Sequence, residues 1–262
     1  MADDACQGLV NGGSPLTRPC CGTRPQRPSW HALRDLFPET SGVSWSLLQA
    51  RGGDVRRLRV TGPGRLATHG AMPSNLTIGY FVGSLSRESI NRKLARALDR
   101  LAPPDMMLEE IPYSDLPLYN RDFDANYPPP AVALKDAILA ADAILFVTPE
   151  YNRSIPGALK NALDWASRPY GTNAFTGKPS AVIGASIGKI GTAVAQQHLR
   201  TLLAFSNSPQ FSGMEAYVHF TPNLIDDEGK VADSATEDVL RDFMEGFHAF
   251  IGRLADDGAN RP

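Results

Sequence analysis

Short apolar runs alternate along the chain with segments in which apolar residues recur every three or four positions. The runs predict strands, and the helical spacing after each run predicts a helix. This strict alternation indicates an α/β fold with five parallel strands and helices on both faces. The predicted strands cover residues 76–83, 106–111, 143–147, 180–186 and 214–220, and the best-delimited helices cover residues 91–101, 131–141, 193–205 and 235–254.

The third strand and the loop after it form the most informative stretch. Residues 143–147 are apolar throughout, which is typical of a strand buried on both faces. Pro149 ends the strand, and a polar loop over residues 150–154 leads into the next helix. Ser154 is the predicted cap of that helix, and Pro156 falls in its first turn. Ligands bind at the carboxyl ends of strands in open α/β sheets, so this loop is a candidate site.

The alternation leaves the order of the strands open. In the flavodoxin-like order 2-1-3-4-5, the chain reverses direction between the first and third strands, and the loops at residues 84–91 and 149–154 meet there. These are the two most polar strand-end loops of the chain. We therefore predict this order and a crevice between the two loops, with residues 186–192 as its third wall.

The loop after the first strand is crowded with hydroxyl groups. Ser84, Ser86 and Ser89 precede a predicted helix, with Arg87 among them. The N–H groups at a helix start, together with such side chains, favour a bound phosphate. Ordinary capping of the helix by Ser86 or Ser89 accounts for the same residues equally well. The loop by itself leaves both interpretations open.

Residues 1–71 differ in composition from the rest of the 262-residue chain. They contain nine arginines, five acidic residues and no lysine, which gives a formal net charge of about +4, whereas the rest of the chain has a formal net charge of about −6. Ten glycines, six prolines and no sustained apolar period predict a disordered or dispensable extension. Met72 directly precedes the first strand pattern, so we expect an extension over residues 1–71 and a folded domain over residues 72–262.

All three cysteines, Cys6, Cys20 and Cys21, lie in the extension. The folded part therefore has no thiol for a disulfide, a metal site or nucleophilic catalysis. No stretch approaches the roughly 18 apolar residues of a membrane span, and residues 1–10 lack the apolar run of a signal peptide. The arginines of the extension are scattered rather than clustered. We expect a cytoplasmic protein without a metal, a membrane contact or a nucleic-acid partner.

The loop motifs resemble those of a known family, the NADPH-dependent FMN reductases, and in particular its chromate and quinone reductase branch. The specific pieces are Gly83-Ser84-Leu85 with Ser89 and Asn91, Pro149-Glu150-Tyr151-Asn152, Ser154-Ile155-Pro156-Gly157 and Leu159-Lys160-Asn161. Further similar stretches are Leu116-Pro117-Leu118-Tyr119, Gly177-Lys178-Pro179 and Gln197-His198-Leu199-Arg200. The resemblance covers residues 76 to about 254, which is all of the expected folded part.

The resemblance implies a flavodoxin-like fold that binds one FMN, with the phosphate in the first loop and the ring against the second. The residues implied at the phosphate and ribityl end are Ser84, Ser86, Arg87, Ser89, Ile90 and Asn91. Those implied at the isoalloxazine ring are Pro149, Glu150, Tyr151 and Asn152, with Ser186 and Gly188 beside it. Many members have an arginine directly after Gly-Ser-Leu, where this chain has Ser86 and then Arg87.

The implied function is an NADPH- or NADH-dependent reductase. Hydride would pass from the nicotinamide to FMN and then to a quinone, azo, nitro or chromate-type acceptor, so no side chain needs a catalytic role. Arg153 is the best candidate for a contact to a nucleotide phosphate. The alternatives are a flavodoxin-type electron carrier without substrate turnover and a flavin-free Rossmann domain. The charge of about −6 is modest for a carrier, and no GxGxxG motif follows a strand.

The resemblance also implies a homodimer or homotetramer in which a neighbouring subunit completes the flavin pocket. Leu159 and Leu163 form a stripe on the helix after the second loop, and Trp165 falls away from this stripe. We expect Trp165 to leave apolar surface outside the monomer core, which a two-fold contact would bury. The long loop over residues 115–130 is expected to be functional or interfacial, without forming a deep apolar lid.

Overall fold

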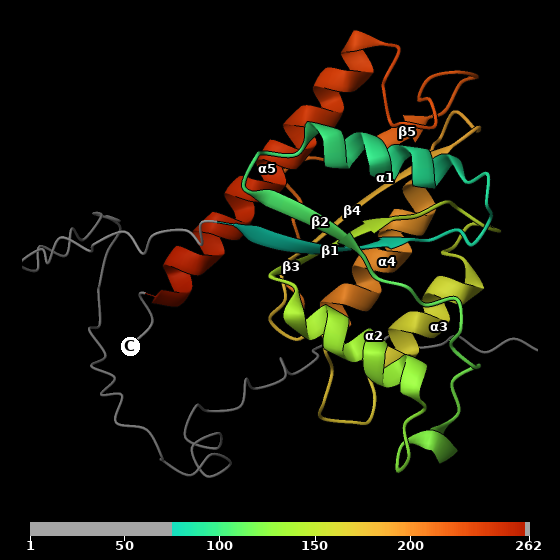
Figure 1. Cartoon of the computed structure of the whole chain (residues 1–262), viewed down its shortest axis with the longest axis vertical. Helices are drawn as coiled ribbons and strands as arrows, with labels where there is room; N and C mark the ends of the chain where they lie inside the picture. The colour runs from blue at the N-terminus through green and yellow to red at the C-terminus, as the bar shows by residue number, and fades with distance from the viewer. Residues whose placement is uncertain (1–74, 260–262) are drawn as a thin grey trace, which may run out of the picture. The chain divides into compact units, whose positions relative to one another are not determined.

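Five parallel strands form one sheet in the order β2-β1-β3-β4-β5 (Figure 1), which confirms the predicted flavodoxin-like order. The computed structural model describes residues 75–259, so the prediction of a disordered extension over residues 1–71 lies outside the described residues. In chain order the elements are β1 (Leu76–Val82), α1 (Ile90–Leu101), β2 (Met106–Glu110), the short 3-10 helix η2 (Arg121–Phe123), α2 (Pro129–Ala140), β3 (Ala143–Val147), α3 (Gly157–Ala166), β4 (Ser180–Ser186), α4 (Ala193–Phe205), β5 (Tyr217–His219) and α5 (Ser234–Ala259).

Helices cover both faces of the sheet: α1 and α5 lie on one face, and α2, α3 and α4 lie on the other (Figure 1). Successive side chains of β3 point to opposite faces of the sheet. Leu145 therefore packs toward α1 and α5, while Phe146 packs toward α2, α3 and α4. All five residues of β3 are buried. The continuous apolar run thus marks the central strand, as the sequence predicts.

The boundaries of α1 follow from local chemistry. Ser89 is its N-cap, and the Ser89 Oγ accepts a hydrogen bond from the Arg92 backbone N–H at 3.4 Å. Leu94 and Leu98, one turn apart, are fully buried on the face toward the sheet. The helix ends at Leu101, with Ala102 as its C-cap, because the two prolines that follow at positions 103 and 104 cannot continue it.

The structure corrects three predicted boundaries. The prolines at positions 128–130 begin α2 instead of closing a loop, since a first helical turn does not need their missing N–H groups. Strand β5 is shorter than predicted, because the Ala216 carbonyl accepts from the side chain of Gln196 at 2.8 Å instead of joining the ladder. Helix α5 runs longer than predicted, to Ala259, since no proline interrupts it.

The expectation that Trp165 leaves apolar surface outside the monomer is wrong. Trp165 is fully buried, and its Nε1 donates to the Pro117 carbonyl at 2.7 Å. The rings of Tyr119 and Tyr127 pack edge-on against it, both at 5.1 Å between centroids. The loop over residues 115–130 therefore folds over α3 and buries this tryptophan within the same chain.

Candidate functional site

The ends of four neighbouring strands are joined in a row at the carboxyl edge of the sheet. The Gly83 N–H donates to the Val147 carbonyl at 2.8 Å, and the Thr148 N–H donates to the Ile183 carbonyl at 3.0 Å. The Phe220 N–H continues the row by donating to the Ser186 carbonyl at 2.8 Å. These bonds lie at the starts of the loops after β1, β3 and β4 and directly after β5. The structure thus brings the three predicted loops to one edge of the sheet.

In the first loop, two of the predicted serines already have partners. Ser84 is buried, and its Oγ accepts from the Ser86 N–H at 3.3 Å. Ser89 is buried as the cap of α1. Ser86 and Arg87 are exposed, and the first turn of α1 contains no acidic residue that would repel an anion. Capping and phosphate binding are compatible here, because a hydroxyl that accepts from a backbone N–H still has its own proton to donate.

Asn91 has a structural role that sequence reasoning missed. It is almost completely buried, and its Nδ2 donates to the Ala185 carbonyl while its Oδ1 accepts from the Ala185 N–H, both at 2.9 Å. This pair of bonds holds the start of α1 against β4. The predicted role of Asn91 in cofactor binding therefore finds no support in its hydrogen bonds, while Ile90 beside it stays partly exposed at the helix start.

In the second loop, Glu150 faces the protein and not the solvent. Its side chain is 9% exposed, and its Oε2 accepts from the N–H groups of Val194 and Ala195 at 3.0 and 3.1 Å. Its Oε1 accepts from Arg153 Nη1 at 3.2 Å. A carboxylate at this place caps the N-terminus of α4 and stabilises it electrostatically. Arg153, the predicted nucleotide contact, is thereby paired with Glu150.

Residues 151–154 make a tight two-residue turn. The backbones of Tyr151 and Ser154 exchange two hydrogen bonds of 2.9 Å, and Asn152 and Arg153 have φ angles of 51° and 62°. Positive φ at both central positions defines a type I′ turn, which asparagine tolerates. This turn presents Tyr151, 50% exposed, and Asn152 at the surface after Pro149.

Ser154 does not cap α3, contrary to the prediction. Pro156 occupies the N-cap position and makes no side-chain cap bond. The Ser154 Oγ instead lies 3.1 Å from Nδ1 of His198 on α4. Ser154 and His198 border a groove between α3 and α4, about 450 Å³ in volume, whose other walls include Ile155, Thr201 and Leu202.

In the third loop, Ser186 and Gly188 are linked directly, because the Ser186 Oγ accepts from the Gly188 N–H at 3.1 Å. Ile187 is 79% exposed and Ile190 is exposed as well, so the third loop presents two apolar side chains to the solvent. A surface with a polar edge and an exposed apolar rim suits a flat aromatic ligand with polar atoms along one side.

Tyr113 is a buried residue near this edge that sequence reasoning missed. Its hydroxyl donates to the carbonyl of Val82, the last residue of β1, at 2.7 Å. Burial raises the pKa of Tyr113, and the nearby Glu110 carboxylate adds to the shift. The hydroxyl therefore remains a donor at neutral pH. No periodic pattern marks Tyr113, since it follows β2 and its partner lies 31 positions earlier.

Within residues 75–259, no group of three or more His, Cys, Asp or Glu side chains is arranged so that it could hold a metal ion. None of the helices in this described part is both long and apolar enough to cross a membrane.

Known proteins are similar to this chain in sequence and in fold. The 2-hydroxy-1,4-benzoquinone reductase of Burkholderia sp is 46% identical over 176 residues, which is 67% of this chain and 96% of that protein. The quinone reductase of Escherichia coli K12 is 38% identical over 192 residues, 70% of this chain and 99% of its own length. The solved structure of FerB, a flavoenzyme NAD(P)H:(acceptor) oxidoreductase from Paracoccus denitrificans, is 42% identical with a TM-score of 0.66 and covers 68% of this chain and 98% of FerB.

A model of the family described as NADPH-dependent FMN reductase matches residues 76–222, which include β1 to β5 and all three strand-end loops. This match spans more than half of the chain. The chain therefore belongs to the NADPH-dependent FMN reductase family.

Proposed function

We propose that this protein is an NAD(P)H-dependent reductase that holds FMN and reduces quinones. The observation that carries the proposal is the row of hydrogen-bonded strand ends, which gathers three polar loops at the switch point of the sheet in a member of this family. The quinone reductases among its relatives support the acceptor class. Azo, nitro and chromate-type acceptors remain proposals from the family resemblance.

The first loop is the proposed phosphate end of the cofactor site. Ser84, Ser86 and Ser89 offer hydroxyl donors, and Arg87 offers a cation at the N-terminus of α1. Together with the helix N–H groups, this donor set fits the dianionic phosphate of FMN. Ile90 contributes its backbone N–H at the helix start in this proposal.

The second and third loops are the proposed ring end. Pro149, Tyr151 and Asn152 would lie on one side and Ser186 and Gly188 on the other. Glu150 acts here as a positioning residue, because it ties the second loop to α4. FMN, when bound, supplies the redox chemistry, namely hydride acceptance from a nicotinamide and reduction of the acceptor. The chain contributes binding, orientation and a rim that limits the access of water.

The rival function is a flavodoxin-type electron carrier, which would hold FMN without turning over a substrate. Anaerobic rapid mixing of the FMN-loaded protein with NADPH or NADH separates the two. A reductase bleaches the flavin absorbance quickly, and a quinone added afterwards restores it. A flavin band that persists for minutes in excess nucleotide would support the carrier and contradict our proposal.

We also propose that residues 72–262 alone form the enzyme. The matched part of this chain, about two thirds of it, spans 96% to 99% of the relatives named above. Residues 1–71 are then dispensable for turnover.

A homodimer is also part of the proposal, on different grounds from those in the sequence. Trp165 is buried and no longer supports it, but the groove between α3 and α4 lies beside the second loop, because Ser154 belongs to both. Tyr151, half exposed, is bonded through its backbone to Ser154 at the border of this groove. A two-fold contact over this region would cover both grooves and both rims at once.

A further inference from the structure

The third loop presents a cation between two large apolar side chains. Ile187, Lys189 and Ile190 are all exposed, and they lie within four consecutive positions. The surface that they form is apolar on both sides of a single positive charge. Such a surface suits a ligand that is divided in the same way, with a flat apolar body and one anionic group.

The backbone that carries these side chains is held at both ends. The Ser186 Oγ accepts from the Gly188 N–H at 3.1 Å. The Gly191 N–H donates to the Gly188 carbonyl at 2.9 Å, which closes a four-residue turn with Lys189 in its second position. Gly191 has a φ of 65°, and a Cβ atom added to it would lie 2.9 Å from the Cβ of Tyr217 in β5. Lys189 therefore stands on a fixed support, which lowers the entropy cost of binding.

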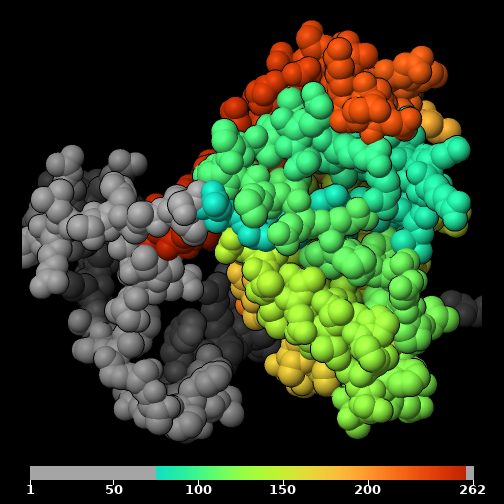
Figure 2. Space-filling view, in the orientation of Figure 1, coloured from blue at the N-terminus to red at the C-terminus, as the bar shows by residue number. Residues whose placement is uncertain are grey.

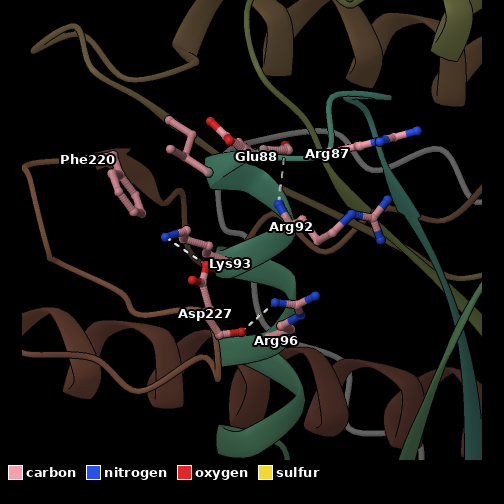
Figure 3. Close-up of a pocket in the computed structure, with 9 residues that line it drawn as sticks. Arg87, Glu88, Arg92, Lys93, Arg96, Phe220 and Asp227 are labelled. Carbon is pink, nitrogen blue, oxygen red and sulfur yellow. Dashed lines mark hydrogen bonds and ion pairs between the residues drawn. The ribbon is translucent and has the colours of Figure 1, made fainter.

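The cations in the first two turns of α1 have anionic partners (Figure 3). Arg92 Nη1 lies 2.6 Å from Glu110 Oε2. On the surface, α1 lies next to the segment that follows β5 (Figure 2), and Lys93 Nζ lies 2.9 Å from Asp227 Oδ1. The hydrogen bond from Lys93 lowers the pKa of the Asp227 carboxyl, and the charge of Arg96 adds to this shift. These charges are thus largely met within the domain.

Lys189 differs from these cations. Within residues 75–259, its side chain takes part in no ion pair or hydrogen bond. The sequence has no acidic residue between Asp164 and Glu215. The Glu150 carboxylate at the N-terminus of α4 already accepts from two backbone N–H groups and from Arg153. With respect to the described part of the chain, Lys189 therefore keeps its charge for a ligand.

The turn lies at the proposed ring end of the cofactor site. Gly188, which we assign to the ring, immediately precedes Lys189. Glu150 ties the second loop to the N-terminus of α4, which begins four residues after Lys189. An acceptor that approaches the ring from the solvent therefore meets the tip of this turn.

We infer that Ile187, Lys189 and Ile190 form an acceptor subsite that selects aromatic quinones with a negatively charged substituent. This inference rests on the proposed reductase function. The two isoleucines would pack against the quinone, and the Lys189 ammonium would pair with an ionised hydroxyl, carboxylate or sulfonate on it. In the reduction the quinone gains a hydride, which derives from NAD(P)H, and a proton from water. The substituent is unchanged, so its charge serves recognition alone.

A nucleotide phosphate fits this surface less well. Lysine is a single point charge, whereas a dianionic phosphate is best met by several donors, as at the N-terminus of a helix or from an arginine fork. Two isoleucines beside one cation match an aromatic ring with one acidic group more closely.

The test uses 1,4-naphthoquinone and its 6-sulfonate, in which the charge lies on the ring that is not reduced. Lys189→Met in the full-length, FMN-loaded protein removes the charge and keeps the length of the side chain. The ratio of kcat/KM for the sulfonate to that for the parent quinone should fall about threefold to tenfold, because one exposed charge contact is lost. Lys189→Arg should recover most of this ratio. Arg100→Met, which removes an exposed cation in the last turn of α1, should keep the wild-type ratio.

A binding measurement gives a second readout that does not depend on turnover. Calorimetry compares naphthalene-2-sulfonate with the neutral naphthalene-2-sulfonamide, neither of which can be reduced by the enzyme. The wild-type protein should bind the sulfonate more tightly, and Lys189→Met should bind both equally. Ile187→Ala should weaken both alike, since the apolar contact is common to them.

Four outcomes would overturn the inference. The first is an unchanged acceptor ratio in Lys189→Met. The second is a raised KM for NADPH in this variant at saturating neutral quinone, which would assign Lys189 to the nucleotide. The third is a loss of chromate reduction in Lys189→Met together with unchanged binding of both naphthalene probes in Ile187→Ala, which would indicate a general anion site. The fourth is a changed sedimentation of Lys189→Met, which would assign the turn to a subunit contact.

The failure of this inference differs from a failure of the reductase function. A protein that reduces both naphthoquinones equally well, with and without Lys189, remains a reductase and lacks only the proposed subsite. A protein that oxidises NADPH and NADH with neither acceptor contradicts the reductase function, while the calorimetric comparison still reports on the subsite.

Discussion

The Oε2 atom of Glu150 accepts a hydrogen bond from the backbone N–H of Val194 at 3.0 Å, across 44 positions of sequence. This bond joins the loop after β3 to the helix after β4, which are two walls of the proposed ring site. An acidic residue beside a flavin suggests an acid or base, but this carboxylate is occupied by the N-terminus of α4. Its contribution to function is therefore to hold the loop after β3 against the N-terminus of α4.

The first prediction concerns this cap. Glu150→Ala should lower the free energy of unfolding by about 1 to 3 kcal/mol, because two N–H groups at a helix start lose a charged acceptor. It should also weaken FMN binding, since the second loop is no longer tied to α4. Urea unfolding and fluorescence titration with FMN measure the two effects. Arg153→Ala is the control: its side chain is 67% exposed, and a loss of at most about 1 kcal/mol is expected. Equal stability of Glu150→Ala and wild type would contradict the capping role.

The second prediction concerns the close approach of β3 and β4. A Cβ atom added to Gly184 would overlap the carbonyl oxygen of Thr148 and the Oγ1 of Thr192, so the backbone of β4 would have to shift. Gly184→Ala should cost about 3 kcal/mol or more, or prevent folding. Gly157→Ala is the matched control, because nothing lies within 4 Å of the added atom. Thermal unfolding of the two variants should differ clearly, and similar melting temperatures would show that the strands can separate without penalty.

The third prediction concerns the phosphate end. The double variant Arg87→Ala, Ser89→Ala should retain FMN poorly after gel filtration, because each lost charge-assisted or capping bond contributes about 1 to 3 kcal/mol. The wild-type protein should be yellow, with about one FMN per chain. Arg100→Ala, in the last turn of the same helix, should keep its flavin. A double variant as yellow as the wild type would remove the first loop from the proposed cofactor site.

The fourth prediction concerns the division of the chain. A protein that begins at Met72 should fold and turn over as the full chain does, because all five strands and the three loops lie after this position. A shorter protein that begins at residue 84 should not fold, since it lacks β1, which pairs with both β2 and β3. Circular dichroism and steady-state quinone reduction measure the outcome. Loss of activity on removal of residues 1–71 would show that the enzyme needs them.

The fifth prediction concerns the proposed dimer. Sedimentation at micromolar concentration should give a dimer or a larger even oligomer for the wild type. Thr201→Arg places a bulky charge at the exposed border of the groove between α3 and α4 and should shift the protein toward the monomer. Ala133→Arg, on the exposed surface of α2 and outside the groove, should leave the oligomer intact. A wild-type monomer with full activity would contradict the proposal.

Periodicity and turn chemistry in the sequence determined the elements and their succession along the chain. Residues 180–186 and 193–205 form β4 and α4 with the predicted bounds, because a buried apolar run and a helical stripe are local properties of the chain. The two most polar strand-end loops also indicated the switch point, since polar residues after a buried strand are tolerated where the chain meets solvent or a ligand.

Only the tertiary structure decided which polar and aromatic side chains are available to contact a cofactor or another subunit. Asn91 binds the backbone of Ala185, 94 positions later, and Trp165 binds Pro117, 48 positions earlier. From the sequence alone, an asparagine is equally compatible with a cofactor ligand, and a tryptophan with an exposed interface residue. No local pattern separates these roles from the buried ones that the structure shows. The sheet brings α1, β4 and the loop at residues 115–130 to their partners, and burial then requires each polar atom to find a hydrogen bond. Which side chains remain available for FMN is therefore set by packing between distant segments, which the spacing of residues along the chain does not encode.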